Sequence, residues 1–200
     1  MVVKRFSTPE VFPMVTNPQR RLTLVDAAIE VLARDGARGL TFRAVDAEAG
    51  VPKGTASNYF ANRDDLLNQA AERIHLRVSV GDADDTETDP RTRLTHFMRL
   101  LLHRISDDRT GWLALLELRL EATRRPELRA KLTKTLRENL DANVEGRRQG
   151  GLPGDDLTTV LLYYAMTGLL LERLTLPDVL AGVDLDELVA DFVRRCLPHE

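Results

Sequence analysis

Residues 49–67 concentrate small and hydrogen-bonding side chains that could contact a polyanion. The stretch reads AGVPKGTASNYFANRDDLL and brings a lysine, two hydroxyls, an asparagine and a tyrosine into seven positions. Gly50 allows a sharp turn, and Gly54 lets a helix backbone approach a phosphate without an intervening side chain. Hydroxyl and amide groups suit phosphate oxygens and base edges, and Lys53 and Arg63 add cations. The stretch therefore predicts a surface that contacts nucleic acid.

Helices on both sides must position this stretch. Apolar residues repeat at helical spacing in residues 20–36, and Gly36 ends this first helix. Thr41 can cap a second helix, Pro52 begins a third, and Asn62 caps a longer fourth. Three short helices before a long one, with a glycine-containing turn, predict a helix-turn-helix whose second helix enters the major groove of DNA. The alternative is a surface helix hairpin with an ordinary polar face.

The remaining chain also predicts helices, with no alternating strand pattern and no internal repeat. The polar, acidic segment 81–90 is the clearest break in the chain. Five further helices are expected to begin near Pro90, Thr110, Pro126, Asp155 and Asp184. The predicted fold class is therefore all-α, with about nine helices in an N-terminal helix-turn-helix domain and a C-terminal helical domain.

Composition narrows the function classes. The 200 residues carry a net charge of -3, which argues against a protein that coats nucleic acid indiscriminately. The single cysteine, Cys196, excludes an internal disulfide and a cysteine metal cluster. The longest apolar run, residues 160–171, is shorter than the roughly 20 residues of a membrane span. No signal peptide is apparent, so we expect a cytoplasmic protein without a membrane partner.

Residues 20–67 resemble the DNA-binding domain of the TetR family of transcriptional regulators (TetR/AcrR type). The similarity runs without a gap and includes AGV at 49–51, the Gly54–Thr55 and Tyr59–Phe60 pairs, and Asn62 with Arg63. It implies a DNA operator as partner and a small-molecule effector bound elsewhere in the chain. The implied function is a ligand-responsive regulator, a repressor that a small molecule releases from a palindromic operator.

The resemblance and the residue types together predict the residues that contact DNA. Phosphate contacts are expected from Lys53, Thr55, Tyr59 and Arg63, and base contacts from Arg43, Ser57 and Asn58, with Thr41 and Gly54 completing the set. The sequence departs from the family pattern at Asp46, Pro52 and Ser57. We expect Asp46 to face solvent or to pair with Arg43.

The resemblance also implies a division of the chain. A flexible arm is expected over residues 1–16, the helix-turn-helix domain over 17–67, and a ligand-binding and dimerisation domain over 68–200. In this family the last two helices pair with their mates in a second subunit. A helix that is apolar all round, as in residues 160–171, independently requires burial on more than one side. The predicted homodimer interface comprises Leu161, Ala165, Gly168, Leu169, Leu188 and Phe192. The alternative is a central helix in a monomeric core.

An effector cavity is expected among the helices of the C-terminal two thirds. Glu117 is informative because a carboxylate on an inward face needs a partner, which can be an arginine, a hydroxyl or a bound molecule. The predicted lining comprises Phe97, Met98, Trp112, Leu116, Glu117, Tyr163 and Tyr164. The alternatives are a salt bridge at the domain edge for Glu117 and ordinary core positions for some of the aromatic residues.

The sequence offers little for catalysis or metal binding. His96 and His103 lie seven residues apart on one helix, about 10 Å, which is too far for one metal ion, so we expect solvated side chains. No nucleophile elbow or phosphate-binding loop occurs. We therefore expect no enzyme activity, no cofactor and no metal. The rival hypotheses are an α-helical enzyme and a ligand-binding protein without DNA binding.

Overall fold

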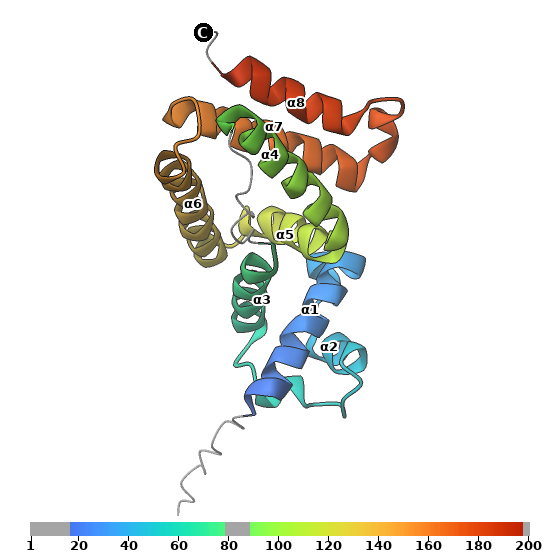
Figure 1. Ribbon diagram of the computed structural model, residues 1–200. Helices are drawn as coiled ribbons and strands as arrows, with labels where there is room; N and C mark the ends of the chain where they lie inside the picture. Colours follow the sequence, from blue (N-terminus) through green and yellow to red (C-terminus); the bar gives the residue numbers. More distant parts are fainter. Residues whose placement is uncertain (1–16, 79–88, 198–200) are drawn as a thin grey trace, which may run out of the picture.

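The computed structural model describes residues 17–78 and 89–197, and every regular element in these residues is helical (Figure 1). The predicted arm over 1–16 lies outside the described residues. Eight α-helices and two short 3₁₀-helices follow in chain order: α1 (Pro18–Gly39), α2 (Phe42–Glu48), η1 (Ala56–Asn58), α3 (Arg63–Val78), α4 (Pro90–Asp107), α5 (Arg109–Ala122), α6 (Pro126–Gln149), α7 (Asp156–Thr175), η2 (Pro177–Leu180) and α8 (Leu185–Cys196). The all-α prediction is confirmed, and the third predicted helix is the short η1.

Side-chain caps fix the beginnings of several helices where the sequence predicted them. Thr41 Oγ1 accepts a hydrogen bond from the Ala44 amide at 3.1 Å and starts α2. Asn62 Oδ1 accepts one from the Asp65 amide at 2.9 Å, in the first turn of α3. These side chains satisfy amide groups that have no partner inside the helix, and so they set where α2 and α3 begin.

Helix α5 joins the two ends of the molecule (Figure 1). On one side its buried residues Ala114 and Leu118 share a core with α1, α2, η1 and α3. On the other side Trp112 packs against a second core formed by α4, α7 and α8. Helix α6 packs against α5, α7 and α3. Helices α5 and α6 therefore each contact both α3 and α7.

Within the part of the chain that the structure describes, no helix combines the length and hydropathy needed to span a membrane.

Candidate DNA-recognition segment and internal cavity

The turn between α2 and η1 is held by a buried carboxylate. Asp46 on α2 is 2% exposed, and its two oxygens accept hydrogen bonds from the amides of Gly54 and Ala56, both at 2.7 Å. Gly54 adopts φ +89°, a conformation that side chains disfavour, so the amide can point at Asp46. The expectation that Asp46 faces solvent or pairs with Arg43 was wrong. Because both oxygens bind backbone amides, Asp46 fixes the segment from residue 52 to residue 58.

This segment, which we call the recognition segment (Pro52–Asn58), presents polar groups to solvent. Lys53, Ser57 and Asn58 are exposed on it, and Arg43 is exposed on α2. Ser57 Oγ donates to the Gly54 carbonyl at 2.8 Å, so that its hydroxyl supports the turn. The side chains of Arg43, Lys53 and Asn58 bind no other described residue and remain available for a ligand.

Three predicted DNA contacts have structural roles in the fold. Thr55 is half-buried, and its Oγ1 donates to the Pro52 carbonyl at 2.6 Å. Tyr59 is 5% exposed and belongs to the core, with the Arg21 guanidinium 5.8 Å from the centre of its ring. Arg63 points inward, where Nε donates to the Leu40 carbonyl at 3.1 Å. Both side chains pack against α1, Tyr59 on its flank and Arg63 at its C-terminal end, and their contacts with phosphate stay a prediction.

An ion network connects the beginning of α3 with α5 and the start of α6. Glu121 on α5 is buried and accepts a hydrogen bond from Arg125 Nε at 2.6 Å, and Arg63 Nη1 lies 3.6 Å from the same oxygen. Arg125 also pairs with Asp64 in the first turn of α3. The hydrogen bond from Arg125, aided by the nearby charges of Arg63 and Arg124, holds the pKa of Glu121 below its ordinary value. This network joins the helix that follows the recognition segment to the rest of the chain.

Glu117 belongs to the same junction and not to a cavity. Its Oε2 accepts a hydrogen bond from the Ala37 amide at 3.2 Å, just after Gly36 turns the chain with φ +69°. A side chain at Gly36 would meet this carboxylate at 3.0 Å. The prediction that Glu117 lines an effector cavity was wrong, because this part of α5 lies along α1. Leu116, its half-buried neighbour, does not line the cavity either.

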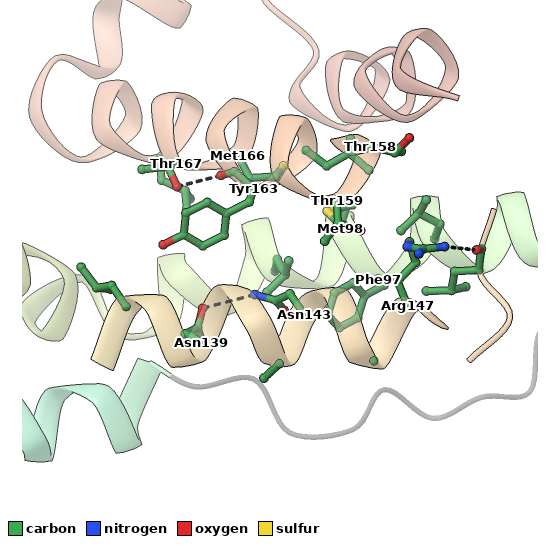
Figure 2. Close-up of a pocket in the computed structure, with 18 of the residues that line it drawn as sticks. Phe97, Met98, Asn139, Asn143, Arg147, Thr158, Thr159, Tyr163, Met166 and Thr167 are labelled. Carbon is green, nitrogen blue, oxygen red and sulfur yellow. Dashed lines mark hydrogen bonds between the residues drawn. The ribbon is translucent and has the colours of Figure 1, made fainter. Parts of the chain in front are cut away.

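A cavity of about 710 Å³ lies between α3, α4, α5, α6 and α7 (Figure 2). Four predicted residues line it: Phe97, Met98, Trp112 and Tyr163. Tyr164, which was also predicted, is 62% exposed and points away from this cavity. The volume falls within the usual range for small-molecule sites, about 300–1,000 Å³.

Polar residues of α6 line the cavity, and sequence reasoning missed them. Asn143 Nδ2 donates to Asn139 Oδ1 at 3.2 Å (Figure 2). Arg147 Nη1 donates to the Gly154 carbonyl at 2.7 Å. Two buried polar atoms at the cavity have no partner among the described residues, Arg147 Nε and Thr159 Oγ1. The spacing of Asn139, Asn143 and Arg147 along one face of α6 was the available signal.

Family models match most of the chain. "Bacterial regulatory proteins, tetR family" covers residues 24–70, and "Tetracyclin repressor-like, C-terminal domain" covers residues 89–199, which is more than half of the chain. The chain belongs to the TetR family. It is a DNA-binding transcriptional regulator with a ligand-binding C-terminal region.

Individual members of the TetR family are similar over most of their length. The nicotine-responsive transcriptional repressor HdnoR of Paenarthrobacter nicotinovorans is 27% identical over 132 residues, 65% of this chain and 68% of that protein. A TetR-family structure from Streptomyces coelicolor A3 is 33% identical with a TM-score of 0.71, covering 91% of this chain and all of that one. The multidrug binding protein EbrR complexed with ethidium is 30% identical with a TM-score of 0.63, covering 90% of this chain and 99% of that one.

One face of α7 is apolar and exposed. Leu157, Leu161, Tyr164, Gly168 and Leu171 recur at helical spacing along this face and are all exposed, and we call them the α7 stripe. A side chain built at Gly168 would meet nothing within 4 Å. TetR-family regulators form dimers, and an exposed apolar stripe is the kind of surface that a second subunit covers.

The other predicted interface residues are less exposed than the α7 stripe. Ala165 is half-buried, and Leu188 and Phe192 on α8 are half-buried against the core shared with α4 and α7. Leu169 is 5% exposed within that core, so its prediction as an interface residue was wrong. His96 and His103, as expected, are exposed.

Proposed function

We propose that this regulator is a repressor that binds a near-palindromic operator as a homodimer and is released when a small molecule fills its cavity. The proposed division places the DNA-binding domain at residues 17–67 and the ligand-binding and dimerisation domain after it. Because its target is chromosomal DNA, the protein would act in the cytoplasm. The function is one of binding, and we assign no catalytic step to any residue.

The recognition segment is the proposed DNA reader. Arg43 and Asn58 carry planar hydrogen-bonding groups suited to base edges, and Lys53 carries a cation suited to phosphate. Asp46 supports this role because it holds the backbone between them in one conformation before DNA binds. A fixed backbone reduces the conformational entropy that binding must otherwise remove.

The observation that carries the release mechanism is the composition of the cavity wall. Ala71 and His75 of α3 line the cavity, and α3 begins at Arg63, five residues after Asn58. A ligand that favours one position of α3 therefore favours one position of the recognition segment. In a dimer, a change in the separation of two recognition segments breaks the match with successive major grooves.

The α7 stripe is the proposed core of the dimer interface. Gly168 supports this assignment because the absence of a side chain would let two helices approach closely. A closed two-fold dimer brings the same stripe of both subunits together and gives the operator its symmetry.

DNA binding tests the proposal directly. The protein is titrated against the DNA upstream of its own gene and against random DNA of equal length, with fluorescence anisotropy as the readout. We expect tighter binding to the upstream fragment, and Asn58→Ala should remove most of that difference. Equal affinity of the wild-type protein for all fragments at physiological salt would refute sequence-specific binding at the tested site.

A further inference from the structure

The described lining of the cavity carries positive charge and no negative charge. Its ionisable side chains are His75, Arg93, Arg119 and Arg147, and no aspartate or glutamate is among the described residues that line it. An organic cation held inside a cavity is stabilised by a carboxylate counter-charge, and the described lining offers none. Together with Arg119, this favours a ligand with negative charge.

Arg119 is the cation most in need of a partner. It lies on the face of α5 that also presents Trp112 and Leu115 to the cavity, and it is half-buried. Its side chain makes no hydrogen bond or ion pair with a described residue. The two carboxylates nearest in the helix are engaged elsewhere, because Glu117 binds the Ala37 amide and Glu121 binds Arg125. A guanidinium that lines a cavity without a described counter-charge can pair there with the anionic group of a ligand.

Arg147, in the last turn of α6, differs from Arg119 because its charge has a partner. Its guanidinium donates to the Gly154 carbonyl at 2.7 Å and pairs with Asp156 at 3.0 Å, so its charge is already compensated. At the cavity, its Nε and Thr159 Oγ1 are buried without a partner among the described residues, and both can donate a hydrogen bond. From Leu132 to Arg147 the cavity wall follows α6 for about 22 Å at 1.5 Å per residue.

Apolar side chains make up much of the cavity wall. They come from three helices, among them Phe97, Met98, Leu136, Met166 and Leu170, and the amides of Asn139 and Asn143 lie on the same wall. An apolar body of some length would remove this surface from water, while one charged end would meet Arg119.

We propose that the effector is an elongated amphiphilic anion with an apolar body along α6 and a carboxylate head group paired with Arg119. This inference rests on the proposed release by a cavity ligand and adds the chemical class of that ligand. The EbrR structure holds ethidium, a cation, whereas a cation in this cavity would lie beside Arg119 and would find no carboxylate among the described lining residues.

Three probes of one chain length test the head group: dodecanoate, its methyl ester and dodecyltrimethylammonium, all below their micellar concentrations. Trp112 is the only tryptophan of the chain and lines the cavity, so its fluorescence reports binding. We expect dodecanoate to bind at least about tenfold more tightly than the ester, and the cation to bind most weakly.

Three variants locate the charge. Arg119→Gln should weaken dodecanoate binding about 10- to 100-fold and leave the ester unchanged, and Arg119→Lys should retain part of the preference. Arg129→Gln removes an exposed arginine of α6 outside the cavity and should change neither affinity. If Arg119→Gln does not fold, the wild-type and Arg119→Lys series still measure the head-group preference.

The preference for the anion is overturned if the cation binds as tightly as dodecanoate, if Arg119→Gln leaves dodecanoate affinity unchanged, or if no probe binds. DNA affinity of the same samples is measured without probe. Specific DNA binding together with any of these results refutes only the anionic effector, whereas loss of specific DNA binding in the wild-type protein refutes the proposed function itself.

Discussion

Asp46→Asn replaces the carboxylate that holds the recognition segment by a side chain of equal size. The carboxylate accepts amide hydrogen bonds from Gly54 and Ala56, both at 2.7 Å. An asparagine can accept only one of them, and its own NH₂ group then faces the second amide donor. One buried amide is left unpaired, and the remaining bond loses its charge.

The expected cost follows from these two bonds. Hydrogen bonds to a charged group contribute about 1.5–3 kcal/mol each, and a neutral bond about 1 kcal/mol, so the free energy of unfolding should fall by about 2–5 kcal/mol. For a chain of this size, that corresponds to a melting temperature lower by about 4–20 °C. DNA affinity should fall as well, because the recognition segment loses its fixed backbone.

The assay combines thermal unfolding at one fixed protein concentration with DNA titration. Glu48→Gln is the matched control. Glu48 lies two residues further along α2, and its ion pair among the described residues is with exposed Arg34. A surface pair of this kind contributes about 0–1 kcal/mol, so the control should melt within a few degrees of the wild type. If Asp46→Asn melts with the control and binds DNA as the wild type does, the carboxylate does not hold the segment.

Three further changes test other parts of the structure. The pKa of Glu121 is depressed by Arg125, so its ionised form stabilises the fold above its ordinary pKa of 4.5, and this stabilisation is lost as the pH falls through the lower folded value. The denaturation curves of Glu121→Gln should therefore lose that part of their acid dependence. An unchanged pH profile would contradict the network. Asn58→Ala should cost about 1–3 kcal/mol on the operator and little on random DNA in anisotropy titrations, and equal losses on both would exclude a base-reading role. Gly168→Leu should overpack the α7 stripe and shift sedimentation toward monomer or aggregate, while a monomeric wild type at micromolar concentration would refute the interface.

Local signals in the sequence predicted the helices well. The caps at Thr41 and Asn62, and the prolines that open α4 and α6, act within one turn, so the residues themselves carry the information. The exposed polar groups of residues 52–58 were predicted for the same reason, and their contact with DNA stays a prediction. Three details differ: α1 continues past a kink at Gly36 to Gly39, the third helix is the three-residue η1, and η2 (Pro177–Leu180) was not predicted.

The directions of individual side chains depended on tertiary packing and were predicted less well. Arg63 and Glu117 were expected at a DNA surface and in a cavity, but both lie at the junction with α1. Nothing local distinguishes a guanidinium that binds phosphate from one that binds the carbonyls of Leu40 and Ala37. The place of α5 between two cores decides both positions, and that arrangement arises from contacts far apart in the sequence.

Selection of DNA from a random pool tests the central claim most directly, because it requires sequence reading and dimer symmetry together. The wild-type protein should enrich a near-palindrome whose half-sites are centred about one helical turn, or a multiple of it, apart. The Asn58→Ala protein should enrich the same spacing with a weaker preference at particular base pairs. A wild-type pool that stays random, or that converges on a single asymmetric half-site, would contradict a dimeric regulator that reads DNA through residues 52–58.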